Sequence, residues 1–366
     1  MSSGARASSA RGWRGLLGDV GEGVKVDFHT HLIPKSWPDF SRRYGYPGFV
    51  HIDHSQEHVE ADGNARLVRD SEMYFEVGPN CWDLERRIVD MDAAGIDIQV
   101  VSTIPELFSY WAKGDDAADL ARILNNDMSE QIALHGNDRF IGLGTVPLQA
   151  PELAVAELQR CMCELGFAGV IIGTHINEWS LDAPELIPFW EAAEDLGACI
   201  LVHPNNLETK GRDDKYLVAK VCGIGAEICH GVTCFLTAGI LDKFPLLKVC
   251  FAYGGGSFPY VRGEIEHGLR NASSQEGFAN AVSKDMYFGK FYCDSIVRTP
   301  ESRKFLLETM QEENVVFGSD YPAPLGEFSA SSRTEKYHAA GKAVFSDYSE
   351  STRKKLFSEN ARRLLE

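Results

Sequence analysis

The chain has 366 residues, of which 44% are hydrophobic, and it carries a formal net charge of −17. This length exceeds the about 100–200 residues of an average domain, but an α/β barrel reaches it as a single unit. The acidic balance argues against a nucleic-acid partner, which needs a basic surface. No uninterrupted apolar run approaches the about 20 residues of a membrane span, so we expect a soluble protein without a membrane partner.

The N-terminal tail and the cysteines bear on where the protein resides. Residues 1–22 are rich in Ser, Gly and Ala and have no acidic residue before Asp19. This composition indicates either a disordered tail or an organelle transit peptide. Nine cysteines without a C-x-x-C pair are predicted to be buried free thiols of a reducing compartment. We expect a cytoplasmic protein, with organelle targeting through residues 1–22 as the alternative.

A short apolar strand is predicted over residues 24–31, and it ends in His29 and His31. Residues i and i+2 of a strand point to the same side, so both imidazoles leave the strand in one direction. A single divalent ion could then bind both rings. Two unrelated histidines at the surface or in the core are the alternative.

A long insertion follows this strand. Residues 33–82 contain Pro34, Pro38 and Pro47 together with many aromatic side chains, which need somewhere to be buried. We therefore predict a folded lid or small subdomain over a barrel mouth, in place of a linker.

From residue 84 onward, helical and strand patterns alternate. Helices are predicted over 84–94, 117–135, 151–165, 184–196, 217–240, 260–269, 300–311 and 349–365, and strands over 98–101, 140–146, 169–172, 199–202, 247–252, 291–293 and 315–317. Eight apolar strands alternating with helices indicate a parallel sheet. We predict one α/β domain over residues 23–366, a (β/α)8 TIM-like barrel with an insertion after strand 1. An open doubly wound sheet is the alternative, but no G-x-G-x-x-G motif follows strand 1.

Polar residues follow three of the later strands, namely His203, Tyr253 and Asp320. A barrel brings its strand ends to one rim, where catalytic groups collect. Three imidazoles and one carboxylate are typical Zn²⁺ ligands, and an open position can hold water and lower its pKa toward ~7. We predict a metal site formed by His29, His31, His203 and Asp320, in which Asp320 could also accept a proton. The alternative is that His203 and Asp320 only cap helices or fill hydrogen bonds.

Two further histidines, His175 and His230, are predicted to be structural, although His175 follows a strand and could lie near the barrel mouth.

Several segments of the chain resemble a known family. They are 29–39, 80–83, 108–113, 139–145, 149–155, 173–179 and 243–252. They resemble the decarboxylase branch of the amidohydrolase superfamily, and within it the 2-amino-3-carboxymuconate-6-semialdehyde decarboxylase family of tryptophan and kynurenine catabolism. The resemblance covers about residues 25–330. It implies a distorted (β/α)8 barrel, one Zn²⁺, a homodimer, and nonoxidative loss of CO2 from a small unsaturated carboxylic acid.

The chain departs from this family at four positions. Tyr253 stands where the family has a histidine that activates the water on the metal. Glu76 and Glu264 stand where the family has arginines that bind the substrate's carboxylate, and Asn205 stands where it has a tryptophan. A phenol, with a pKa near 10, is a poorer base than imidazole, and a glutamate repels a dicarboxylate.

The leading hypothesis is a zinc-dependent decarboxylase with Asp320 and Tyr253 as catalytic residues and Glu76, Asn205 and Glu264 at the substrate. Tyr253 could act as a ligand, as an acid, or only as a packing residue. One rival is a metal-dependent hydrolase or lyase acting on another, less anionic substrate. A second rival is a catalytically silent homologue that keeps its metal for folding or pairs with a partner.

Overall fold

The described part of the chain comprises residues 23–55, 63–70, 72–135, 138–205, 218–272, 289–323 and 344–366 of a computed structural model. The predicted tail, residues 1–22, lies outside the described residues. So do residues 56–62 and 71 of the predicted lid.

Eight parallel strands form one sheet in the order β1-β5-β6-β7-β10-β11-β12-β13. They are β1 (Val26–His31), β5 (Ile98–Ser102), β6 (Phe140–Thr145), β7 (Gly169–Gly173), β10 (Cys199–His203), β11 (Lys248–Phe251), β12 (Tyr292–Asp294) and β13 (Val315–Val316). The Phe28 amide donates to the Phe317 carbonyl at 2.8 Å, and Thr30 forms a parallel bridge with Tyr321. These contacts bring the first and last strands together, so the predicted (β/α)8 barrel is confirmed.

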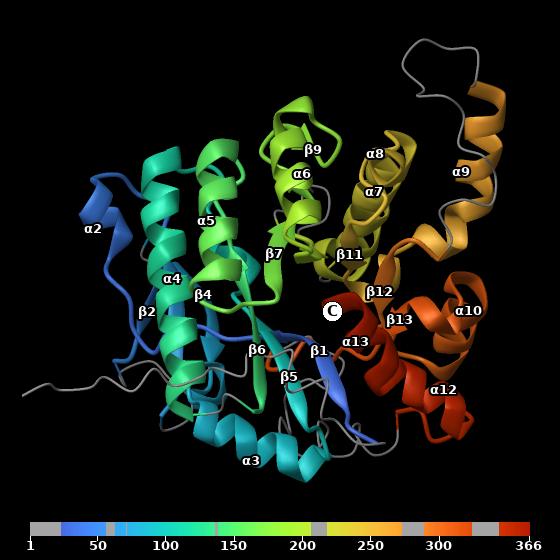
Figure 1. The fold of residues 1–366 in the computed structure, drawn as a ribbon. Coiled ribbons are helices and arrows are strands. Elements are labelled where there is room, and N and C mark those ends of the chain that lie inside the picture. Colours follow the sequence, from blue (N-terminus) through green and yellow to red (C-terminus); the bar gives the residue numbers. More distant parts are fainter. Residues whose placement is uncertain are drawn as a thin grey trace, which may run out of the picture.

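Helices follow the strands and surround them (Figure 1). They are α3 (Leu84–Ala94), α4 (Gly114–His135), α5 (Pro151–Cys163), α6 (Ile187–Asp195), α7 (Ile224–Thr237), α8 (Ile240–Lys243), α9 (Phe258–Ala272), α10 (Pro300–Met310), α12 (Glu350–Lys354) and α13 (Asn360–Leu365). Single turns of 3₁₀ helix occupy Pro79–Cys81, Pro105–Leu107, Pro184–Leu186, Tyr253–Gly255 and Glu312–Asn314, and π turns occupy Ala219–Gly223 and Lys355–Glu359.

The strands are buried because helices cover the outside of the barrel and side chains fill its inside. Every residue of β1, β5, β6, β7 and β10 is buried. Close packing is tightest at Gly169, where an added Cβ would lie 1.8 Å from the carbonyl oxygen of Cys199 on the neighbouring strand. Only glycine therefore fits at the start of β7.

The insertion after β1 forms a small antiparallel sheet of its own. Its strands are β2 (Val50–Asp53), β3 (Ala65–Arg69) and β4 (Glu72–Val77), paired in that order, and the short helix α2 (Phe40–Tyr44) precedes them. Phe40, Phe49 and Leu67 lie in a second hydrophobic cluster separate from the barrel core. The aromatic side chains of the insertion thus have a core in which to be buried. Its role as a lid stays a prediction.

Two sequence expectations meet exceptions in the structure. The stretch Ala219–Thr237 is long and apolar enough, by length and composition alone, to cross a membrane, and 28% of it is buried. Lys220 and Glu227 interrupt it, and in the fold it is the helical connection between β10 and β11. None of the nine cysteines forms a disulfide, but only Cys161, Cys199, Cys250 and Cys293 are buried. Cys81, Cys229 and Cys234 are partly buried, and Cys163 and Cys222 are exposed, so the expectation of buried thiols is confirmed for four of the nine and wrong for the two exposed ones.

Candidate metal centre

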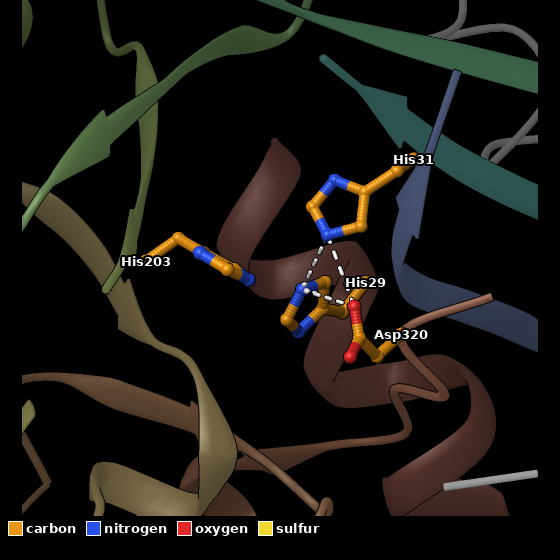
Figure 2. Close-up of side chains that lie close together, drawn as sticks. All are labelled: His29, His31, His203 and Asp320. Atoms are coloured by element: carbon orange, nitrogen blue, oxygen red, sulfur yellow. Dashed lines mark hydrogen bonds and ion pairs between the residues drawn. The ribbon is translucent and has the colours of Figure 1, made fainter. Parts of the chain in front are cut away.

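The carboxyl ends of three strands bring four side chains together. His29 and His31 lie at the end of β1, His203 ends β10, and Asp320 follows β13. All four residues are buried, and one ligand atom of each lies within 4.8 Å of the others. Figure 2 shows the three rings and the carboxylate converging on a common point, with His203 reaching it from the side opposite His31 and Asp320.

The distances between these atoms suit coordination of one ion. His31 Nε2 lies 3.1 Å from Asp320 Oδ1 and 3.3 Å from His29 Nε2. His29 Nε2 lies 3.7 Å from the same carboxylate oxygen.

Each histidine is fixed through its other ring nitrogen. His29 Nδ1 donates to Asp294 Oδ2 at 2.7 Å, His31 Nδ1 to the Thr103 carbonyl at 3.0 Å, and His203 Nδ1 to the Pro204 carbonyl at 2.8 Å. With the protons on Nδ1, the three Nε2 atoms present lone pairs to the common point, as metal-binding histidines do.

The same hydrogen bonds provide a test of whether a metal fits. His203 Nε2 is buried and has no hydrogen-bond partner among the described residues. His29 Nε2 and His31 Nε2 face each other at 3.3 Å although neither carries a proton in this arrangement. Buried lone pairs without donors are costly, and a cation between them relieves both problems. The donor set therefore fits a divalent ion.

The charges at the centre also favour a cation. Burial acts to raise the pKa of Asp320, but the neighbouring imidazoles of His31, His29 and His203 lower it to about 2. Burial lowers the pKa of His31 and lowers that of His203 well below 6.5. Burial opposes protonation of His29 too, but its bond to Asp294 and nearby carboxylates raise its pKa. The site thus offers an ionised carboxylate and two imidazoles that stay neutral at neutral pH.

Asp294 was missed by the sequence analysis, which ended the seventh strand one residue too early. It ends β12, and besides His29 it accepts the backbone N–H groups of Gly254 at 2.9 Å and Ile296 at 3.1 Å through Oδ1. A usable signal was present, since Asp294 directly follows a predicted strand, as His203 does.

Tyr253 lies beside the four ligands. Its hydroxyl donates to Asp320 Oδ2 at 2.8 Å, and its ring lies 5.7 Å from that of His29 and 5.4 Å from that of His203. Burial and the Asp320 carboxylate raise its pKa well above 10. In this arrangement the phenol is therefore a protonated donor to a ligand carboxylate.

The backbone at these two residues is strained. Tyr253 has φ 51° and Asp320 has φ 60°, in the left-handed region that non-glycine residues rarely adopt. Such conformations cost about 1–3 kcal/mol each and gather at functional sites. Here they aim the phenol and the carboxylate at each other.

The remaining predicted residues lie at different places. Asn205, two residues after His203, donates to the His175 carbonyl at 3.2 Å. Glu76 lies in β4 and accepts from Asn64 Nδ2 at 2.5 Å. Glu264 is exposed on α9, and no contact joins it to the four ligands within the described ranges. Substrate binding by these three residues stays a prediction.

One more carboxyl group near the centre was not foreseen. Glu106 lies in the 3₁₀ turn Pro105–Leu107 that follows β5. Burial raises its pKa, and the charge of Asp320 adds to this, whereas Arg69 and Lys220 act in the opposite direction. The charges of these three residues therefore act on Glu106.

The chain is similar to known proteins over most of its length. The amidohydrolase family model matches residues 26–366. The chain is 39% identical over 338 residues to 2-amino-3-carboxymuconate-6-semialdehyde decarboxylase of Dictyostelium discoideum, covering 92% of this chain and 90% of that protein. It is 32% identical over 363 residues to the protein of the same name from Caenorhabditis elegans, covering 86% and 89%.

The fold is similar to a solved structure of 5-carboxyvanillate decarboxylase from Novosphingobium aromaticivorans, complexed with manganese and 4-hydroxy-3-methoxy-5-nitrobenzoic acid. The TM-score is 0.73 at 23% identity, covering 93% of this chain and 96% of that one.

Proposed function

The chain belongs to the amidohydrolase family, in its 2-amino-3-carboxymuconate-6-semialdehyde decarboxylase branch, and from this premise we propose that it releases CO2 from a small unsaturated carboxylic acid. Its first candidate substrate is 2-amino-3-carboxymuconate 6-semialdehyde, the substrate in the names of both relatives. The observation that carries the proposal is the buried centre of three histidines and Asp320 in a chain so similar to a decarboxylase.

Zinc is the metal we propose for this centre, held by His29, His31, His203 and Asp320. Three imidazole nitrogens and one carboxylate oxygen are a donor set that Zn²⁺ commonly takes. A bound divalent ion would supply Lewis acidity toward substrate oxygens. Manganese is the alternative, because a structural neighbour was solved with it.

Side chains of the protein would supply the proton that decarboxylation consumes. The bond between the carboxyl carbon and the substrate breaks, its electron pair stays on the substrate carbon, and that carbon must gain a proton. Tyr253 holds a proton at its hydroxyl oxygen, 2.8 Å from Asp320 Oδ2. We assign Tyr253 as the donor and Asp320 as the group that orients it, with solvent restoring the phenol afterwards.

The acidic residues at the predicted substrate positions favour a rival assignment. Glu76 and Glu264 would repel a dicarboxylate if they bind the substrate directly. A less anionic substrate of a related hydrolase or lyase is therefore the second candidate, and a catalytically silent homologue is the third.

Assembly and location are proposals from the resemblance and the composition alone. A homodimer and a cytoplasmic location remain our expectations, with targeting through residues 1–22 as the alternative.

The experiment that tests the function is a substrate panel on purified protein loaded with zinc or with manganese. We expect CO2 release from 2-amino-3-carboxymuconate 6-semialdehyde and none from 2,6-dihydroxybenzoate. Hydrolysis of an ester or amide panel without CO2 release would support the second candidate. Stoichiometric metal without turnover of any compound would support the silent homologue.

A further inference from the structure

A histidine and a cysteine lie side by side on helix α7, outside the metal centre. His230 and Cys234 are four residues apart in this helix, so they share one of its faces. Cys234 Sγ lies 3.7 Å from Nε2 of His230 and 4.0 Å from Nδ1. The imidazole is exposed to solvent and the cysteine is partly buried. None of the four ligands of the metal centre comes from α7.

The separation of these two side chains suits a shared metal ion. In a tetrahedral zinc site the Zn–S bond is about 2.3 Å and the Zn–N bond about 2.1 Å, which places the sulfur and the nitrogen about 3.6 Å apart. Ligands at positions i and i+4 of a helix can hold one zinc ion because a single turn sets them on the same side. The exposed ring of His230 can turn about its Cβ–Cγ bond to aim Nε2 at an ion beside the sulfur. Two coordination positions are therefore available without a change in the backbone.

The charges around the sulfur favour a cation. Burial and the charge of Asp182 raise the pKa of Cys234, a hydrogen bond with Ser180 lowers it, and the charge of Glu227 raises it. Asp182 is exposed and lies two residues after strand β9 (Trp179–Ser180). These carboxylates disfavour a bare thiolate, but they attract a cation bound to it, and a metal ion deprotonates the thiol that coordinates it.

Glu227 lies on the same face of α7 as His230 but has other partners. Its Oε1 accepts from His175 Nδ1 at 2.9 Å and from the Thr174 hydroxyl at 2.7 Å. The sequence analysis predicted that His175 and His230 are structural, and the bond to Glu227 is consistent with this role for His175. In the described part of the chain, the approach to Cys234 is the one polar side-chain contact printed by the fold for His230. A structural role therefore does not account for the pairing of His230 with the thiol.

We propose that His230 and Cys234 bind a second divalent cation of the thiophilic class, such as zinc or cadmium, on the outside of the barrel. The thiol proton leaves to solvent as the metal–sulfur bond forms, so no oxidant or reductant is needed. Water would fill the remaining coordination positions. Two protein ligands hold an ion less tightly than four, so this site should fill after the metal centre. The inference does not depend on the reaction proposed for that centre.

The test is a titration of the zinc-loaded full-length protein with cadmium chloride, followed by the ultraviolet charge-transfer absorption of the cadmium–thiolate bond. The metal centre has no sulfur ligand, so this absorption reports on cysteines even if cadmium replaces zinc there. We expect one cadmium–thiolate bond per chain in the wild type and none in Cys234→Ser. His230→Ala keeps the thiol but should weaken cadmium binding about tenfold or more, because even a group that only orients a ligand contributes 10–100-fold to metal affinity.

A matched variant and a metal count separate this site from other thiols. Cys222 is an exposed cysteine with Ala226 at the position four residues on, so Cys222→Ser should bind cadmium as the wild type does. Excess zinc should displace the cadmium and raise the metal content by one ion per chain in the wild type but not in Cys234→Ser. Cys234→Ala serves in place of Cys234→Ser if melting curves show that the serine variant is unfolded.

Three results would overturn the inference. They are a wild type without cadmium–thiolate absorption, an undiminished absorption in the Cys234 variant, and wild-type cadmium affinity in His230→Ala. Loss of the absorption in Cys234→Ser, weaker binding in His230→Ala and unchanged binding in Cys222→Ser together support it. These results hold whether or not the wild type releases CO2, so failure of the proposed function is a separate outcome.

Discussion

Changing Asp294 to asparagine would test how the metal centre is held. Asp294 Oδ2 accepts from His29 Nδ1, while Oδ1 accepts the N–H groups of Gly254 and Ile296. An asparagine oxygen can keep the two backbone bonds, which leaves its NH2 group facing Nδ1 of His29. The ring must then accept at Nδ1 and carry its proton on Nε2, the nitrogen that faces the metal position.

The expected loss in metal affinity follows from this tautomer change. Removing a carboxylate that orients a metal-binding histidine typically costs 10–100-fold in affinity, or about 1.4–2.7 kcal/mol. We therefore expect the zinc affinity of Asp294→Asn to fall within this range while the barrel stays folded.

Competition with a fluorescent zinc chelator measures this affinity, and Asp90→Asn is the matched control. Asp90 is also a buried carboxylate, but it accepts from the Tyr321 hydroxyl at 2.6 Å in place of a histidine. Wild-type zinc affinity in Asp294→Asn would refute the reasoning. So would an equal loss in Asp90→Asn, since it would show a general effect of removing a buried charge.

Four other predictions address the chemistry and the fold. Tyr253→Phe should lower kcat about 100-fold with unchanged zinc content, because it removes a proton donor and leaves the four ligands in place. Steady-state kinetics and metal analysis of the purified variant measure these two quantities. Stripping the metal should lower the urea midpoint, and adding zinc at about 1,000 times its Kd should restore about 4 kcal/mol. Gly169→Ala should cost about 3 kcal/mol or more by urea unfolding, because its Cβ would force β7 away from β10. The backbone hydrogen bond from Ser55 and the ion pair with Arg66 lower the pKa of Asp53 from 3.8 to about 2. The stability that the Asp53 carboxylate contributes is therefore present above pH 3.8 and lost as the pH falls through about 2. The melting temperatures of the wild type and of Asp53→Asn should converge toward about pH 2.

Local signals in the sequence predicted the barrel well. Helix α3 has the predicted bounds, because Asp83 accepts the first N–H groups and Gly95 ends the helix with φ 69°. The eight strands are short and apolar, and each precedes a helical pattern, so their order could be read directly from the chain.

The parts that could not be predicted depend on contacts between distant segments. The small sheet of the insertion pairs strands that carry no clear alternation. The bond from His29 to Asp294 joins residues 265 positions apart, and that from His175 to Glu227 joins residues 52 apart. Only the fold reveals which carboxylate accepts a hydrogen bond from which imidazole, and therefore which ring nitrogen carries the proton.

The most direct test of the proposed function is the amount of CO2 released per molecule of 2-amino-3-carboxymuconate 6-semialdehyde consumed by the zinc-loaded wild type, with Asp320→Ala and Tyr253→His beside it. We predict one CO2 per substrate in the wild type and none in Asp320→Ala. A wild type that holds one zinc per chain and releases no CO2 would contradict the assignment of this substrate. Activity gained in Tyr253→His would then place the defect at that residue, and continued inactivity would direct the search to a less anionic substrate.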